Sequence, residues 1–177
     1  GLTEAHDLAA VRGIPRLASI GVDSWAVDYG FVGPTLRPPD ASSERIGEVI
    51  AYRDSRTDGV ADRLAERVSR ERQFALTGIA QHPPFNTLYQ LAMDDRLGDL
   101  PPGSALLMVP DLIGSLLTGV RRTERTNASS TGMLSLDGRW SPELLEVAGV
   151  SPGSSGPPHL ARRAAGNGAS RARHRAR

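Results

Sequence analysis

Apolar residues in the first 150 positions come in short runs that glycines, prolines and polar residues separate. Residues 17–22 and 26–32 are two such runs, and their length and β-branched content are typical of strands. Residues 46–52 are a third strand candidate, and the apolar run 105–109 is a fourth. Helical patterns lie between these runs, so the order of elements predicts an α/β layer architecture.

The clearest helical pattern begins near Asp58. It places four apolar residues at the spacing of one helical face, namely Val60, Ala61, Leu64 and Val68. Glu66 stands four residues before Arg70, a spacing at which opposite charges pair along a helix. The pattern predicts one helix with a buried stripe and this surface ion pair.

Four further helices are expected from their boundary residues. Residues 4–12 read as a helix that Gly13 ends, and residues 87–97 read as a helix that follows a proline pair. A third begins with Pro110 in its first turn and ends at Gly119, where glycine suits the left-handed residue after a helix. The last helix begins at Ser141 and ends at Gly149.

Composition separates the end of the chain from the rest. The 177 residues are 39% apolar and carry a formal net charge of +1, with 19 glycines and 13 prolines. Residues 1–150 hold 15 arginines and all 20 acidic residues, a net charge of −5, whereas residues 151–177 hold six arginines and no acid. The second segment has almost no large apolar side chain to bury, so we expect a disordered basic tail there.

Several classes of chemistry are excluded by residue type. The chain has no cysteine, and all 21 of its basic residues other than histidine are arginines. A disulfide framework, a thiolate zinc site and the lysine of a phosphate-binding loop are therefore ruled out. The four histidines lie far apart, so no metal site is expected, and no stretch is long and apolar enough to span a membrane. The N-terminus lacks the pattern of a secretory signal, and we expect a cytoplasmic protein without a membrane partner.

Three polar and aromatic strings follow the expected strands. They occupy residues 23–29, residues 52–59 and residues 85–90. Ligands of open α/β sheets bind beyond strand ends, and aromatic faces with carboxylates and amides suit a polyhydroxylated molecule. Each string also has a purely structural interpretation, in which Trp25 is a core residue, Asp54 and Arg56 form a surface pair, and Asn86 is a helix cap.

Five strings stand in a characteristic order along the chain. They are IGVDSWAVDYG at 20–30, YRDSRTDG at 52–59, FNTLYQL at 85–91, MVPD with LTG at 108–119, and ERTNASST at 124–131. This series resembles segments of the rhamnulokinases, which are members of the FGGY carbohydrate kinase family. The resemblance implies an incomplete actin-like, ribonuclease-H-like α/β lobe over residues 1–150. The complete enzyme that it implies transfers the γ-phosphoryl group of ATP, with Mg²⁺, to L-rhamnulose and forms L-rhamnulose 1-phosphate.

Position-by-position matching to the family names the candidate sugar site. Trp25, Ala26 and Asp28 would lie beside the sugar, and Tyr52, Arg53 and Asn86 would belong to the same pocket wall. Ala26 stands where the family usually has glycine, and its methyl group either crowds the sugar or belongs to a subgroup that holds the sugar in a shifted pose. The expected partner is a small ketose such as L-rhamnulose.

The chain also departs from the family pattern. It begins after the strand and turn that hold the ATP phosphates in such kinases, and its similarity stops before their catalytic base and second lobe. We therefore expect no catalytic residue within these 177 residues and no productive binding of ATP or Mg²⁺ by them alone. A non-catalytic sugar-binding lobe is one alternative. Another is a nucleic-acid-binding protein that uses its basic tail, which the −5 charge of residues 1–150 opposes.

Overall fold

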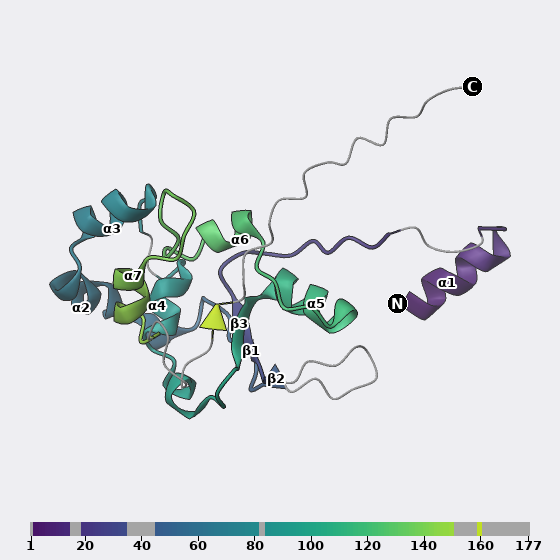
Figure 1. Ribbon diagram of the computed structural model, residues 1–177, viewed down its shortest axis with the longest axis horizontal. Helices are drawn as coiled ribbons and strands as arrows, with labels where there is room; N and C mark the ends of the chain where they lie inside the picture. The colour runs from purple at the N-terminus through teal and green to yellow at the C-terminus, as the bar shows by residue number, and fades with distance from the viewer. Residues whose placement is uncertain (1, 15–18, 35–44, 82–83, 151–158, 161–177) are drawn as a thin grey trace, which may run out of the picture.

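The computed structural model describes residues 2–14, 19–34, 45–81, 84–150 and 159–160 (Figure 1). At its centre is a sheet of four short strands in the order β2-β1-β3-β4. These strands are β1 (Tyr29–Val32), β2 (Arg45–Ile46), β3 (Ala105–Met108) and β4 (His159–Leu160). Strand β1 runs antiparallel to β2 and to β3, and β4 runs parallel to β3. A mixed sheet with helices on its faces agrees with the predicted α/β class.

Helices flank the sheet on two sides (Figure 1). Those gathered on one side are α2 (Val60–Arg67), α3 (Arg70–Thr77), α4 (Thr87–Leu91) and α7 (Pro142–Val147). Helices α5 (Val109–Thr118) and α6 (Arg125–Ser129) lie on the other side, and α1 (Leu2–Val11) lies apart from the other elements. Two short 3₁₀ turns, Ser55–Thr57 and Asp95–Asp99, complete the described elements.

The pleat of β1 and β3 divides the core into two layers. Tyr29 and Phe31 face Met108 and Leu106 across the ladder and join the larger cluster, with α2, α4 and α7. The alternate positions join a smaller cluster under α5, made of Val32, Ala105, Leu107 and Leu112. Successive residues of a strand point to opposite faces, so both faces of these two strands are buried.

Several predicted boundaries are confirmed. The predicted stripe of α2 is buried, with exposed fractions of 1% at Val60 and 6% at Leu64. Pro110 lies in the first turn of α5, and Gly119 ends that helix with φ at 72°. The Ser141 side chain caps α7 by accepting a hydrogen bond from the N–H of Leu144. These features depend on residues within one helical turn of one another, which explains why the sequence predicts them.

Other predicted elements are wrong. The first strand run has no strand in its described part, residues 19–22, while residues 17 and 18 lie outside the described residues. The second is confined to β1, because Val27 has φ at 72° and cannot continue a strand. The third extends no further than Ile46, since Gly47 turns the chain with φ at 70°.

The helical predictions also need two corrections. The segment 87–97 is not one helix, because α4 ends at Leu91 and the carboxylate of Asp94 begins a separate 3₁₀ turn. The pair between Glu66 and Arg70 does not form, because α2 ends between them, and Arg70 instead binds Asp62 at 2.8 Å. Both corrections arise where one helix gives way to a second, closely following element.

The sheet reaches past residue 150. The backbone of His159 and Leu160 forms β4 within the segment that composition separates from the fold. The other residues of the segment 151–177 lie outside the described residues, so the predicted disorder of that tail stays a prediction. Within the described ranges, no helix has the length and apolar character needed to cross a membrane.

Candidate functional site

Asp28 brings two of the sequence strings together. Its side chain is buried, with 2% of the residue exposed, immediately before β1. Oδ2 accepts a hydrogen bond from the indole Nε1 of Trp25 at 2.7 Å, and Oδ1 accepts one from the backbone N–H of Tyr52 at 2.8 Å. A carboxylate that accepts two such bonds fixes both donors relative to β1. Asp28 therefore organises the site.

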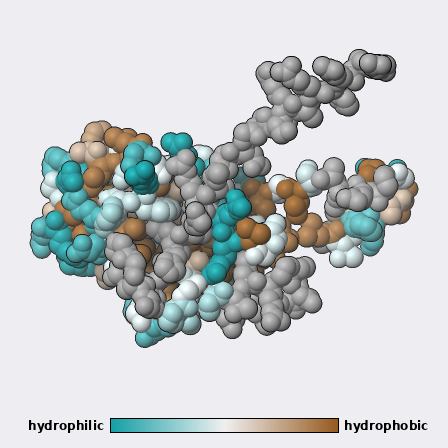
Figure 2. Space-filling model, viewed as in Figure 1, coloured by the Kyte–Doolittle hydropathy of each residue, from teal (hydrophilic) through white to brown (hydrophobic). Residues whose placement is uncertain are grey.

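Trp25 is on the surface. With 59% of it exposed, the interpretation of Trp25 as a core residue is wrong. Ile20 and Val22, in the segment that precedes it, are exposed to 55% and 37%. Apolar surface is visible along the segment between α1 and the sheet in Figure 2. The indole is thus tethered at its nitrogen while its ring remains available to a ligand.

Tyr52, Arg53 and Phe85 form an adjoining aromatic and basic cluster. The rings of Tyr52 and Phe85 meet edge to face with their centroids 5.5 Å apart. The Nε of Arg53 donates a hydrogen bond to the Tyr52 hydroxyl at 2.9 Å, and its guanidinium lies 5.3 Å from the ring centroid. Arg53 and Phe85 are exposed. Contacts within this cluster join the second string to the third.

Asn86 has a different environment. It is buried to 3% exposure, and its Nδ2 donates a hydrogen bond to the carbonyl of Ser130 at 2.9 Å. Asn86 occupies the N-cap position of α4, but its side chain does not cap that helix. The helix-cap interpretation is therefore right about the position of Asn86 and wrong about the hydrogen bond of its side chain. Hydrogen bonds link Trp25, Asp28, Tyr52 and Arg53. Ala26 is half-buried beside them, and Asn86 ties α4 to the end of α6.

The surface-pair interpretation of Asp54 and Arg56 is partly right. Nη1 of Arg56 lies 3.8 Å from Oδ1 of Asp54, and the Arg56 side chain is only 16% exposed. Its Nη2 also donates to Oε1 of Gln90 at 3.3 Å. Arg56 thus reaches inward to α4, which the sequence did not indicate.

Sequence reasoning missed three residues that bond to one another next to Asp28, namely Val27, Thr87 and Gln90. Val27 has a left-handed backbone conformation, and its carbonyl accepts hydrogen bonds from Thr87 at 2.7 Å and from Gln90 at 3.4 Å. Thr87 and Gln90 belong to the string 85–91, but the prediction of sugar-site residues took only Asn86 from that string. Nothing in the local sequence signals a positive φ at a valine.

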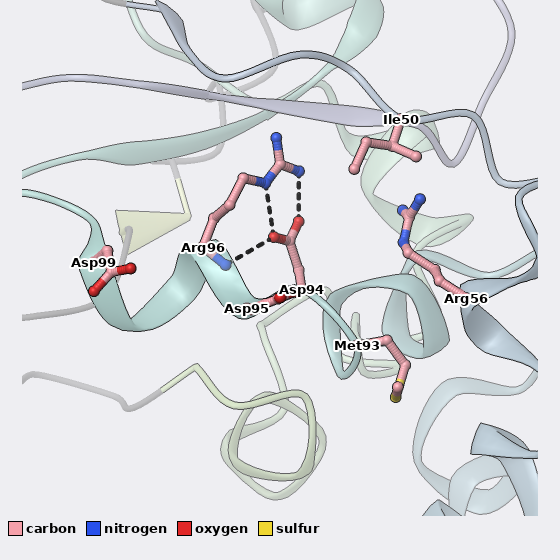
Figure 3. Close-up of a pocket in the computed structure, with 7 residues that line it drawn as sticks. All are labelled: Ile50, Arg56, Met93, Asp94, Asp95, Arg96 and Asp99. Carbon is pink, nitrogen blue, oxygen red and sulfur yellow. Dashed lines mark hydrogen bonds and ion pairs between the residues drawn. The ribbon is translucent and has the colours of Figure 1, made fainter.

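A separate polar cavity of about 270 Å³ opens beside the 3₁₀ turn Asp95–Asp99 (Figure 3). Its wall includes Arg56, Asp94 and Arg96, and Figure 3 shows Asp94 paired with Arg96 while Arg56 stands opposite. Burial would raise the pKa of Asp94, but hydrogen bonds from Arg96 and Tyr29 outweigh it and lower that pKa. None of the six predicted sugar-site residues lines this cavity.

The acidic and histidine side chains of the described residues are dispersed over the structure. In the part of the chain that the structure describes, no three acidic or histidine side chains gather at metal-binding distance. Asp28, the buried carboxylate of the site, already accepts hydrogen bonds at both oxygens.

Comparison with known proteins identifies the class. The N-terminal domain of the FGGY family of carbohydrate kinases matches residues 33–162. This match covers well over half of the chain and includes β2, β3, β4 and the second to fifth strings, while β1 and the first string precede it. The chain therefore belongs to the FGGY carbohydrate kinase family.

Within that family, the chain is similar to rhamnulokinases. It is 43% identical over 152 residues to the rhamnulokinase of Pectobacterium carotovorum, which covers 84% of this chain and 29% of that protein. It is 41% identical over 133 residues to the rhamnulokinase of Bacillus subtilis, which covers 75% of this chain and 26% of that protein. The chain thus spans less than a third of the length of these curated relatives.

Solved structures support the fold. A ligand-bound xylulose kinase from Lactobacillus acidophilus superposes with a TM-score of 0.57 at 20% identity, over 88% of this chain and 30% of that one. Glycerol kinase from Plasmodium falciparum, crystallised with ADP, superposes with a TM-score of 0.64 at 13% identity, over 86% of this chain and 31% of that one. These likenesses show a partial sugar-kinase lobe.

Proposed function

We propose that this chain forms the sugar-facing part of an enzyme that phosphorylates L-rhamnulose with ATP. The observation that carries the proposal is the bonding of Trp25 and Tyr52 to one buried carboxylate, Asp28. That bonding joins two strings that resemble rhamnulokinase segments. The similarity to rhamnulokinases at 41–43% identity supports the choice of sugar.

Each residue of the proposed wall has a distinct task. The exposed indole of Trp25 offers an apolar face to the carbon–hydrogen side of a sugar. Arg53 offers hydrogen-bond donors to hydroxyl oxygens from an exposed position. Asp28 holds the wall in place, and each of its oxygens keeps a lone pair beyond the bond already made. Ala26 adds a methyl group beside the indole and limits the space there.

Phosphoryl transfer needs more than this wall. It requires a cradle for the triphosphate, an aligned acceptor hydroxyl and a carboxylate that takes the hydroxyl proton. Of these three requirements, we propose that the 177 residues supply only part of the alignment of the acceptor hydroxyl. ATP and Mg²⁺ would then act in the complete enzyme, and the lobe by itself would bind the sugar weakly because its wall is only partly preorganised.

A fluorescence titration tests the sugar wall. Trp25 and Trp140 are the two tryptophans of the chain, so a Trp140→Phe variant reports on Trp25 alone. L-Rhamnulose is expected to shift the emission of that variant in a saturable way, and D-xylulose is the matched control sugar. The reciprocal variant Trp25→Phe should give no response. A saturable response that survives in Trp25→Phe would contradict the assignment of Trp25.

A further inference from the structure

Val27 has a backbone conformation that its side chain disfavours. Its φ is 72°, and it is the non-glycine residue with positive φ among those described. A β-branched residue in this region is an outlier, and such strain persists only where surrounding contacts enforce it. Val27 lies between Ala26 and Asp28, at the centre of the proposed sugar wall.

Two side chains of α4 hold the carbonyl of Val27. Oγ1 of Thr87 donates to it at 2.7 Å, and Nε2 of Gln90 donates at 3.4 Å. Both side chains are completely buried, and their spacing of three residues places them on one face of α4. In a buried environment an unpaired carbonyl is costly, so the two donors favour the conformation in which Val27 faces α4.

The helix that carries these donors is itself fixed. The N–H of Leu88 donates to the carbonyl of Thr131 at 2.9 Å, and the far end of the Gln90 amide accepts a hydrogen bond from Arg56 at 3.3 Å. Contacts to two other segments therefore hold α4 in place if the backbone of Val27 moves to a more favourable conformation. The positive φ then turns the chain so that the indole of Trp25 reaches Oδ2 of Asp28 three residues later.

We propose that Thr87 and Gln90 are positioning residues that hold Val27 in its left-handed conformation and thereby set the indole of Trp25 against Asp28. The inference rests on the proposed function only in calling this surface a sugar wall. It gives the string 85–91 a role behind the wall, because its threonine and glutamine act through the Val27 carbonyl.

The test uses Thr87→Val, which removes the hydroxyl at nearly constant volume, in the Trp140→Phe background. Thr87→Ser is the conservative variant that keeps the hydroxyl. Thr77→Val is the matched control, because Thr77 is also buried and donates to a carbonyl, that of Gln73 at 2.8 Å. Acrylamide quenching of Trp25 without sugar measures the position of the indole, and a separate L-rhamnulose titration measures binding.

Thr87→Val should raise the quenching of Trp25 toward its value in the urea-unfolded chain, while Thr87→Ser and Thr77→Val should not. Sugar affinity should fall about three- to tenfold in Thr87→Val, as expected for one lost hydrogen bond. If Thr87→Val does not fold by circular dichroism, Gln90→Met decides by the same readouts. Unchanged quenching in a folded variant overturns the positioning role. If L-rhamnulose does not change the emission of Trp25 in the chain with Thr87 intact, the proposed function is overturned, while the quenching result still stands.

Discussion

The hydroxyl of Tyr29 donates a hydrogen bond to Oδ2 of Asp94 at 2.7 Å, across 65 residues of sequence. Arg96 completes the arrangement, with its Nη2 2.6 Å and its Nε 2.8 Å from the two oxygens of the same carboxylate. Burial, followed by the charge of Asp94, raises the pKa of Tyr29, so the phenol stays protonated and donates. This contact ties the first residue of β1 to the start of the 3₁₀ turn Asp95–Asp99.

Replacing Asp94 should therefore destabilise the fold in a pH-dependent manner. Because the pKa of Asp94 is lowered in the folded state, its stabilising effect is present above its ordinary value near 4 and is lost as the pH falls below it. Asp94→Asn should lower the free energy of unfolding at pH 7 by about 2 kcal/mol, the scale of hydrogen bonds to a charged group. It should also flatten the loss of stability below pH ~4. Urea unfolding across pH measures both effects, with the exposed neighbour Asp95→Asn as the control.

Asp111 should show the opposite pH dependence. Burial, followed by the nearby charge of Glu124, raises its pKa to about 6, against an ordinary value of 3.8. The folded state then holds this proton more tightly than the unfolded state, so stability falls as the pH rises from about 4 to about 6. Asp111→Asn keeps an oxygen for the N–H of Glu124 and removes the charge. We expect a gain of about 1 kcal/mol above pH ~6, a value reduced for solvent screening. A variant less stable than the parent at pH 8 would contradict this account.

Two glycines should respond in opposite directions to alanine. At Gly30 in β1, an added Cβ would lie 2.8 Å from Cδ2 of Leu112 and 3.3 Å from Cγ2 of Val49, so the buried Leu112 side chain would have to shift within its packed layer. Gly30→Ala should cost about 1–3 kcal/mol of unfolding free energy. Gly114 lies within α5 with no atom near its added Cβ, so Gly114→Ala should stabilise by up to about 1 kcal/mol. Thermal unfolding of both variants measures the contrast, and equal effects would refute the packing argument.

The end of the chain allows a test of the domain boundary. Composition predicts that residues 151–177 can be removed without loss, whereas β4 pairs His159 and Leu160 with β3. We expect deletion of residues 161–177 to leave urea unfolding unchanged and deletion of residues 151–177 to lower the midpoint, because the second removes a strand from the sheet. Equal midpoints for the two deletions would place the boundary of the fold at residue 150.

The intact chain should bind polyanions weakly and release them as the salt concentration rises, since its basic end acts by counterion release.

These 177 residues should not turn over L-rhamnulose when supplied with Mg-ATP. The sequence has no lysine and no glycine-rich phosphate loop, and a missing general base alone reduces rates by about 10²–10⁴-fold. A coupled assay for ADP release on the purified chain measures this, with Asp28→Ala as the control for contaminating kinase. Turnover that Asp28→Ala abolishes would belong to this chain and would contradict the expectation. Activity gained by adding the separately expressed remainder of a related rhamnulokinase would support the proposed function.

Local sequence determined the features that neighbouring residues control. The buried stripe of α2, the Pro110 and Gly119 boundaries of α5 and the serine cap of α7 each depend on contacts within about one helical turn. The ordered strings are enough to identify the family, because they record residue types along the chain and need no geometry.

Tertiary structure decided how those strings meet. The N–H of Tyr52 binds Asp28 from 24 residues away, and the carbonyl of Val27 binds Thr87 from 60 residues away. Such bonds override local preference, which is why a valine takes a positive φ. The exposure of Trp25 followed from the same cause, since its nitrogen is held by a carboxylate that only the sheet positions. Sequence thus specified the groups of the site, and burial of polar atoms far apart in the chain specified their arrangement.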